Sequence, residues 1–284
     1  MPNLEHWIVT FVCPDKPGIV HAISGAVVAF SGNITESQQY SSEDTGRFFM
    51  RLQIEAAVET ATFEASFRQI AEAYQMKWRL DHVGRRMRTL VLATKAPHCV
   101  NDLLFRAKAD QLPISVAALV ANHEELGGLA NFFGVEFHNW PTQDSEQRAE
   151  FERKLRELIA REGIELIVLA RFMQILSDEF CRDFEGRIIN IHHSFLPGFK
   201  GARPYAQAHA RGVKLIGATA HFVTADLDEG PIIEQHVTRV SHQDSTARLV
   251  AIGQDVESRT LTQAVRWFAE HRVLIDGQRT VIFS

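Results

Sequence analysis

The stretch that most constrains the fold of this chain is residues 186–203, with the sequence GRIINIHHSFLPGFKGAR. Three isoleucines predict a buried strand, whose end turns polar before a loop that contains proline and glycine. The residues concerned are Ile188, Ile189, Asn190, Ile191, His192, His193, Ser194, Pro197, Gly198 and Gly201. Open α/β sheets present side chains to a ligand crevice in this way, at the carboxyl ends of their strands. The stretch therefore predicts an open α/β sheet with a functional site at this strand end.

A second apolar strand, residues 218–223, leads into the loop TADLDEGP, which carries Asp226, Asp228 and Glu229. The two loops together supply an amide, imidazoles and carboxylates, which is a complete acid–base set. Asn190 and His192 are two residues apart, so a strand projects both to the same face. We expect Asn190 to donate to an oxyanion, His192 to transfer protons, and Asp228 to accept a hydrogen bond from His192 or from water.

Three simpler interpretations stay open on spacing alone. His192 could be a structural histidine, and Asp228 could only form the turn before Gly230 and Pro231. His192, His193 and Asp228 could also bind a metal, but neighbouring strand residues point to opposite faces, so we expect no metal site.

From residue 85 the chain alternates strands and helices, which predicts a Rossmann-like, mostly parallel sheet. The predicted strands are residues 89–94, 114–120, 134–138, 166–170, 188–191, 218–223 and 232–240, with short ones near 273 and 281. The predicted helices are residues 101–109, 124–132, 145–162, 178–184 and 245–269. The turn after the first strand, residues 94–99, contains no glycine, so we expect neither a nicotinamide cofactor nor a phosphate cradle there.

The first 84 residues have a different pattern, in the order βαββαβ of a ferredoxin-like domain. The predicted elements are strands 6–12, 33–41, 47–55 and 77–82, and helices 19–30 and 62–74, with Thr62 as the cap of the second helix. The turn with Asp15, Pro17, Gly18 and Ile19 resembles that of the ACT domain family. This resemblance implies an amino-acid effector at these four residues and side-by-side pairing into a homo-oligomer. A plain assembly module is the alternative.

A length of 284 residues is enough for two domains, and the change of pattern places them at residues 1–84 and 85–284. The formal net charge of −5 gives no basic surface for nucleic acid or an anionic membrane, and no membrane-length apolar run occurs. Three widely spaced cysteines suggest neither a disulfide framework nor a zinc site. We expect a cytoplasmic protein.

Two motifs resemble the signature of the folate-dependent formyltransferase family. They are NIHxSxLP, from Asn190 to Pro197, and HFVTxxLDxGPI, from His221 to Ile232. The resemblance implies catalytic roles for Asn190, His192 and Asp228, and a supporting role for His221. It also implies a folate-binding surface formed by Arg171, Phe172, Met173, Gln174, Ile175, Leu176, Val223, Thr224 and Leu227.

Within that family the whole chain most resembles the 10-formyltetrahydrofolate deformylases, on the segments LARFMQIL, NIHHSFLP and GARPYAQAHARGVKLIGATAHFVT. His193 stands where transferases of this fold usually have proline. The resemblance implies hydrolysis of 10-formyltetrahydrofolate to tetrahydrofolate and formate, without a cofactor, and a supply of formate for purine synthesis. The alternatives are a formyltransferase with an amine acceptor and a non-catalytic folate-binding sensor.

Overall fold

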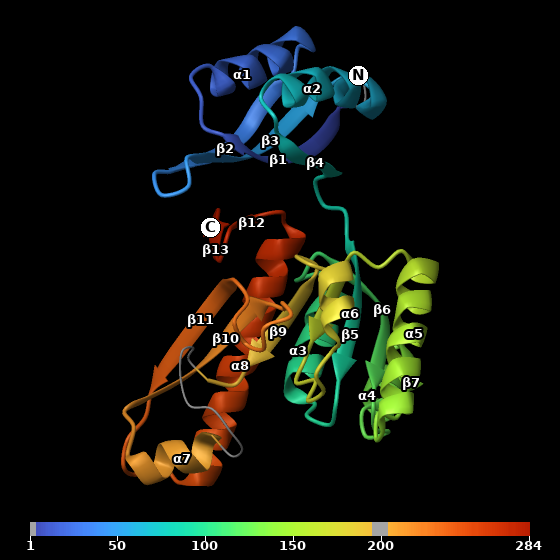
Figure 1. Ribbon diagram of the computed structural model, residues 1–284, viewed down its shortest axis with the longest axis vertical. Helices are drawn as coiled ribbons and strands as arrows, with labels where there is room; N and C mark the ends of the chain where they lie inside the picture. Colours follow the sequence, from blue (N-terminus) through green and yellow to red (C-terminus); the bar gives the residue numbers. More distant parts are fainter. Residues whose placement is uncertain (1–3, 195–203) are drawn as a thin grey trace. The chain divides into compact units, whose positions relative to one another are not determined.

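The computed structural model describes residues 4–194 and 204–284 and divides into two compact units (Figure 1). One unit comprises residues 1–85 and 270–284, and the other residues 86–269. The predicted loop with Pro197, Gly198 and Gly201 lies outside the described residues. The division into domains 1–84 and 85–284 stays a prediction. The compact units differ from it mainly at the C-terminal end, because the last fifteen residues belong with the first unit.

The first unit is built on a four-stranded antiparallel sheet with the strand order β2-β3-β1-β4. Its elements are β1 (Glu5–Pro14), α1 (Ile19–Ala29), β2 (Asn33–Ser42), β3 (Arg47–Ala56), α2 (Thr60–Ala73) and β4 (Lys77–His82). The predicted βαββαβ order is thus confirmed. The second helix begins earlier than predicted, with Glu59 rather than Thr62 at its N-terminal cap.

Both faces of this sheet are covered. Along β1, the alternate residues Trp7, Val9 and Phe11 are buried in one cluster with the apolar stripes of α1 and α2. The opposite face carries Phe49, which is buried against a C-terminal hairpin of β12 (Val273–Asp276) and β13 (Arg279–Ile282). The two short strands predicted near residues 273 and 281 are therefore present, and they complete the core of the first unit.

The second unit contains a seven-stranded sheet with the order β11-β10-β9-β8-β5-β6-β7. Its strands are β5 (Met87–Ala93), β6 (Ile114–Ala121), β7 (Glu136–Asn139), β8 (Leu166–Leu169), β9 (Ile188–His192), β10 (Leu215–Phe222) and β11 (Ile232–Arg239). The five strands from β9 to β7 are parallel, whereas β10 and β11 run antiparallel to their neighbours. This confirms a mostly parallel α/β sheet.

Helices cover both faces of the larger sheet (Figure 1). They are α3 (His98–Lys108), α4 (Gly127–Phe133), α5 (Ser145–Glu162), α6 (Asp178–Asp183), α7 (Pro204–Arg211) and α8 (Thr246–Ala269). The apolar stripes of α5 and α6 share a core with β5 and β6, while α8 contacts α3 and strands β9 to β11. Two predicted starts are wrong, because α3 begins at His98 and α4 at Gly127. The sequence analysis did not predict α7.

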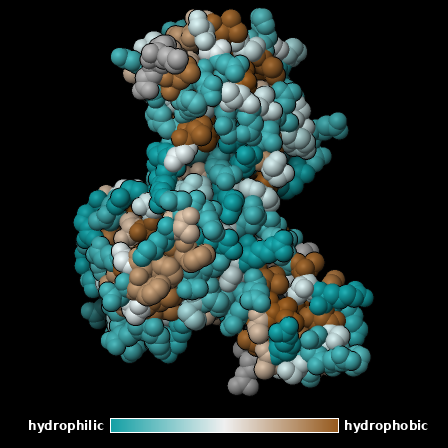
Figure 2. All heavy atoms as spheres, turned by 180° about the vertical axis from the view of Figure 1, so that it is seen from behind, coloured by the Kyte–Doolittle hydropathy of each residue, from teal (hydrophilic) through white to brown (hydrophobic). Residues whose placement is uncertain are grey.

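Hydrophilic side chains cover much of the face shown in Figure 2, with apolar side chains in separate patches. No helix within residues 4–194 and 204–284 is long and apolar enough to cross a membrane.

Candidate active site

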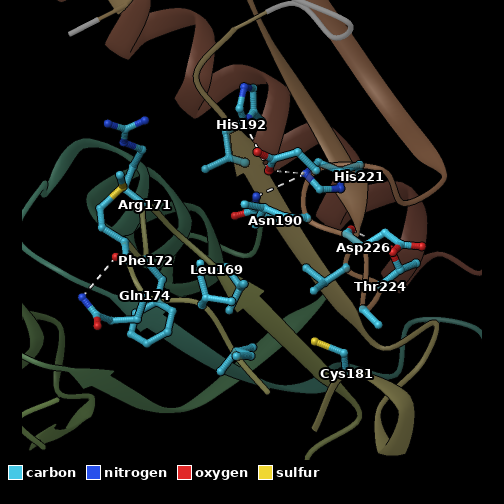
Figure 3. A pocket seen from close by; sticks show the side chains of 18 of the residues that line it. Leu169, Arg171, Phe172, Gln174, Cys181, Asn190, His192, His221, Thr224 and Asp226 are labelled. Carbon is cyan, nitrogen blue, oxygen red and sulfur yellow. Dashed lines mark hydrogen bonds and ion pairs between the residues drawn. The ribbon is translucent and has the colours of Figure 1, made fainter. Parts of the chain in front are cut away.

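A pocket of ≈ 240 Å³ lies at the carboxyl ends of β8 and β9, where the sequence predicted the site (Figure 3). The structure brings all thirteen predicted catalytic and folate-binding residues to its wall. They are Arg171, Phe172, Met173, Gln174, Ile175, Leu176, Asn190, His192, His221, Val223, Thr224, Leu227 and Asp228. Five further residues line the pocket without a site role assigned from the sequence: Leu169, Cys181, Ile191, Ala225 and Asp226. Of these, the sequence analysis names Asp226 only as a carboxylate of the loop and Ile191 only as a residue of the strand. The roles of all these residues stay predictions.

Strand pairing fixes the relative positions of the polar side chains. In β9, Asn190 and His192 alternate with the buried Ile189 and Ile191, so both point into the pocket. The antiparallel neighbour β10 places His221 directly opposite Asn190. The amide Nδ2 of Asn190 lies 3.2 Å from Nε2 of His221.

The hydrogen bonds of His221 define the orientation of Asn190. Nδ1 of His221 lies 2.8 Å from the carbonyl oxygen of Phe222, so Nδ1 must carry the proton. Burial lowers the pKa of His221, which keeps the ring neutral and leaves Nε2 as an acceptor. Asn190 therefore donates one amide hydrogen to His221 and keeps the other for a ligand.

His192 is oriented by a carboxylate. Its Nδ1 lies 3.2 Å from Oδ1 of Asp228, which leaves Nε2 available to the pocket. The hydrogen bond with His192 holds the pKa of Asp228 below its ordinary value, although burial opposes this effect. The ionised Asp228 thus selects the His192 tautomer that has a free Nε2.

The loop that carries Asp228 has an unfavourable backbone conformation at Asp228 and a close backbone contact at Gly230. Asp228 itself has a φ of 59°, a left-handed conformation that costs a residue other than glycine on the order of 1–3 kcal/mol. At Gly230 a β-carbon would overlap the carbonyl of Phe222, so only glycine permits this close approach. The loop does form a turn, as the simpler interpretation supposed, and the same turn places Asp228 beside His192.

The opposite wall is the segment after β8, which enters the pocket through a second strained residue. Arg171 has a φ of 62°. The backbone N–H of Met173 donates to Oγ1 of Thr94 at 2.9 Å, which ties the segment to the end of β5. Phe172 is buried beneath the segment, whereas Met173 and Ile175 are 58% and 74% exposed. An apolar surface is therefore available to a flat ligand on this wall.

His193 corrects one expectation about the strand end. Alternation predicted that it points away from His192, but both side chains line the pocket, and their rings stack at 5.1 Å. The reason is that β9 ends at His192, so the alternation rule stops there. Burial, and then the nearby charge of Arg171, lowers the pKa of His193 to about 4.

A buried polar cluster beside the pocket was missed by the sequence analysis. Glu257 of α8 is 1% exposed and accepts hydrogen bonds from Nε2 of His98 at 2.7 Å and the hydroxyl of Tyr205 at 2.6 Å. Nε of Arg171 lies 3.5 Å from the same carboxylate. The available signal was Glu257 itself, a carboxylate at a core position of an amphipathic helix.

Within the described residues, His98, Cys99 and Glu257 form a group whose ligand atoms are close enough for a metal ion. The chemistry of these atoms fits a hydrogen-bonded cluster better. The Glu257 carboxylate already binds His98 and lies beside the cation Arg171, and burial raises the pKa of the Cys99 thiol.

The predicted effector residues lie in the first unit. Asp15, Pro17 and Gly18 form the turn between β1 and α1, and Ile19 begins the helix with its side chain buried. Gly18 has a φ of 92°, and a β-carbon there would lie 3.1 Å from the hydroxyl of Tyr74. The turn therefore requires glycine, but its role as an effector site stays a prediction.

The chain is similar to known proteins, both over its second unit and over its full length. The family described as "Formyl transferase" matches residues 87–265, which gives the class of the second unit. A glycinamide ribonucleotide transformylase from Symbiobacterium toebii has a TM-score of 0.66 at 33% identity, covering 72% of this chain and 98% of that one.

Relatives over the full length define the family more narrowly. A formyltetrahydrofolate deformylase of Corynebacterium is 44% identical and covers 97% of each chain. The crystal structure of formyltetrahydrofolate deformylase from Burkholderia mallei has a TM-score of 0.95 at 43% identity, covering 99% of this chain and 100% of that one. The chain therefore belongs to the formyltetrahydrofolate deformylase family.

Proposed function

We propose that this protein hydrolyses 10-formyltetrahydrofolate to tetrahydrofolate and formate. The observation that supports this most is the convergence of Asn190, His192 and the ionised Asp228 in one pocket. Such a set can direct water to a carbonyl carbon without a covalent nucleophile. Cys181, the thiol in the pocket wall, is buried and its pKa is raised by burial, so it is a poor nucleophile.

In the proposed reaction, water bound at Nε2 of His192 attacks the formyl carbon, while Asp228 holds the ring through Nδ1. Nε2 of His192 takes a proton from the water as the carbon–oxygen bond forms. The free amide hydrogen of Asn190 and the resulting imidazolium stabilise the tetrahedral oxyanion. The bond from carbon to N10 then breaks, and His192 returns the proton to N10, which releases formate and tetrahydrofolate.

The two walls of the pocket suit the flat pterin ring. Apolar contact comes from the segment of residues 171–176, and residues 223–227 offer backbone polar groups to the edge of the ring. In this loop the Thr224 hydroxyl bonds the carbonyl of Asp226 at 3.0 Å, which limits its conformations. These contacts would hold the formyl group at the end of the pocket where Asn190 and His192 lie.

Incubation with 10-formyltetrahydrofolate and no acceptor tests the proposal, with formate as the readout. We expect many turnovers per enzyme molecule. Release that requires an added amine would identify a transferase instead, and binding without release would identify a folate sensor.

The proposed activity would supply formate for purine synthesis and balance one-carbon pools. A cytoplasmic location, an amino-acid effector at residues 15–19 and a homo-oligomeric state remain predictions from the sequence. The ferredoxin-like first unit is consistent with the last two.

A further inference from the structure

One wall of the pocket, the wall segment of residues 171–177, is irregular chain between two regular elements. The segment follows β8, which ends at Leu169, and precedes α6, which begins at Asp178. Its residues up to Leu176 line the pocket, on the side opposite Asp226 (Figure 3). Irregular backbone lacks the hydrogen-bond ladder of a strand or helix, so its conformation depends on contacts with the elements around it.

The first part of the wall segment is tethered to the end of β5. The backbone N–H of Met173 donates to Oγ1 of Thr94 at 2.9 Å, and the side-chain amide of Gln174 donates to the carbonyl oxygen of Met173 at 3.1 Å. Both backbone polar groups of Met173 are therefore bonded within the protein, while its side chain stays exposed to a ligand. Two residues earlier, Arg171 has a left-handed backbone, a conformation that persists only where surrounding contacts fix it.

The last part of the wall segment is tethered to α5. The backbone N–H and the hydroxyl of Ser177 both donate to the carboxylate of Glu152, at 2.6 Å and 2.5 Å. The Ser177 hydroxyl oxygen also accepts from the backbone N–H of Phe180, so the same residue caps α6. The neighbour of Glu152 in α5, Phe151, stacks on Phe172 with ring centroids 5.6 Å apart. Helix α5 therefore holds the wall segment at two points.

Between the two tethers, the wall segment presents an apolar surface whose shape is fixed before a ligand binds. Phe172 and Leu176 are buried and anchor the segment, whereas Met173 and Ile175 between them are exposed and line the pocket. Exposed apolar side chains gathered in a pocket mark a ligand surface. A surface that is already ordered loses less conformational entropy when the ligand binds, which increases the affinity.

We propose that Thr94 and Glu152 are positioning residues for substrate binding, which hold the wall segment in the conformation that receives the pterin ring. The inference rests on the proposed function for its ligand, a reduced folate. Without a tether, the segment would have the binding conformation for only part of the time, and the apparent Kd would rise by the inverse of that fraction. Asn190 and His192 lie on β9, so the turnover of bound substrate should be preserved.

The first test replaces Thr94. Thr94→Val keeps the shape of the side chain and removes the acceptor for the Met173 N–H. The KM for 10-formyltetrahydrofolate, and the Kd for tetrahydrofolate by isothermal titration calorimetry, should rise about three- to tenfold, the contribution of one neutral hydrogen bond. The kcat should stay within about twofold of that of the unaltered protein. Thr94→Ser restores a hydroxyl and should return both constants to within about twofold of their original values.

The second test replaces Glu152. Glu152→Ala removes the acceptor of two charge-assisted hydrogen bonds and should raise the same KM and Kd by about tenfold or more. Glu146→Ala, which removes an exposed carboxylate from the first turn of the same helix, is the matched control and should change neither constant. Hydrogen exchange should become faster in the peptide of residues 171–177 in Thr94→Val and Glu152→Ala, while β6 keeps its protection.

Unchanged KM and Kd in the folded Thr94→Val and Glu152→Ala variants would overturn the inference, and the release of formate by the unaltered protein would still support the proposed function. A fall in kcat at constant Kd would also overturn it, because the two residues would then act on the chemical step. If the unaltered protein binds tetrahydrofolate but releases no formate, the proposed function is wrong, and the Kd values of the variants alone decide the inference. If one variant does not fold, the other decides.

Discussion

The hydrogen bond between Nδ1 of His192 and Asp228 leaves Nε2 of His192 for the substrate, and the bond between Asn190 and His221 leaves one amide hydrogen of Asn190. If these two groups stabilise the oxyanion, replacing either by alanine should lower kcat by roughly 10²–10³ with little change in KM. Asp228→Asn should be comparably damaging, because it loses the charge that orients His192. Steady-state kinetics of folded variants provide the check, and a variant with normal kcat would remove its residue from the mechanism.

The second residue-scale prediction concerns pH. The pKa of His193 is lowered to about 4, so the ring is neutral above pH 5 and takes up a proton only as the pH falls further. His193→Gln should therefore leave the shape of the kcat/KM profile between pH 6 and pH 9 unchanged. A displacement of the acid limb by more than about half a pH unit would show that His193 titrates in the working range.

At the same scale, local rules explain which site residues could be predicted. Asn190 and His192 share a face because they lie within a regular strand, where alternation is a geometric necessity. The rule failed at His193, one residue beyond the strand. Glu257 was missed because its partners, such as His98 at a separation of 159 residues, are set by tertiary packing.

Among the elements, α8 offers a test of packing against helix propensity. Gly253→Ala should favour the helix intrinsically, but its β-carbon would overlap the Tyr205 ring. We expect overpacking to prevail and to lower the free energy of unfolding by about 1–3 kcal/mol. Gly25→Ala in α1, with no atom near the new methyl group, should instead raise it by about 0.5–1 kcal/mol. Urea denaturation compares the two, and equal stabilisation would contradict the packing argument.

Element boundaries were predicted less well than element types. The pattern of α3 suggested a start at residue 101, since Pro97, His98 and Cys99 resemble a loop, but the helix begins at His98. The difference matters for the buried polar cluster, because the first residue of the helix is the one that reaches Glu257. In α7 the apolar side chains are Tyr205 and three alanines at alternate positions, so periodicity gave no helical signal.

For the whole molecule, the main difference from the predicted domains is that residues 270–284 pack with the first unit. His271 lies 2.8 Å from Asp81, and Ser42 donates to Asp276 at 2.9 Å, so polar contacts join the hairpin region to the first sheet. The change of strand and helix pattern near residue 85 can be read from the sequence, but the location of a terminal hairpin depends on which exposed face needs cover. Here that face is the one with Phe49, which β3 presents away from the helices.

The hairpin should therefore contribute to the stability of the first unit. Phe283 is 6% exposed and packs with Phe49 and Leu274, so Phe283→Ala should cost about 3–5 kcal/mol. Val28→Ala, at a side chain 71% exposed, should change the stability by less than about 0.5 kcal/mol. Urea denaturation gives the free energies, and hydrogen exchange in β3 locates the effect. If β3 amides keep their protection from exchange in Phe283→Ala, the packing of Phe283 does not stabilise this sheet. Residues 270–284 would then contact the first unit without contributing to its free energy of unfolding.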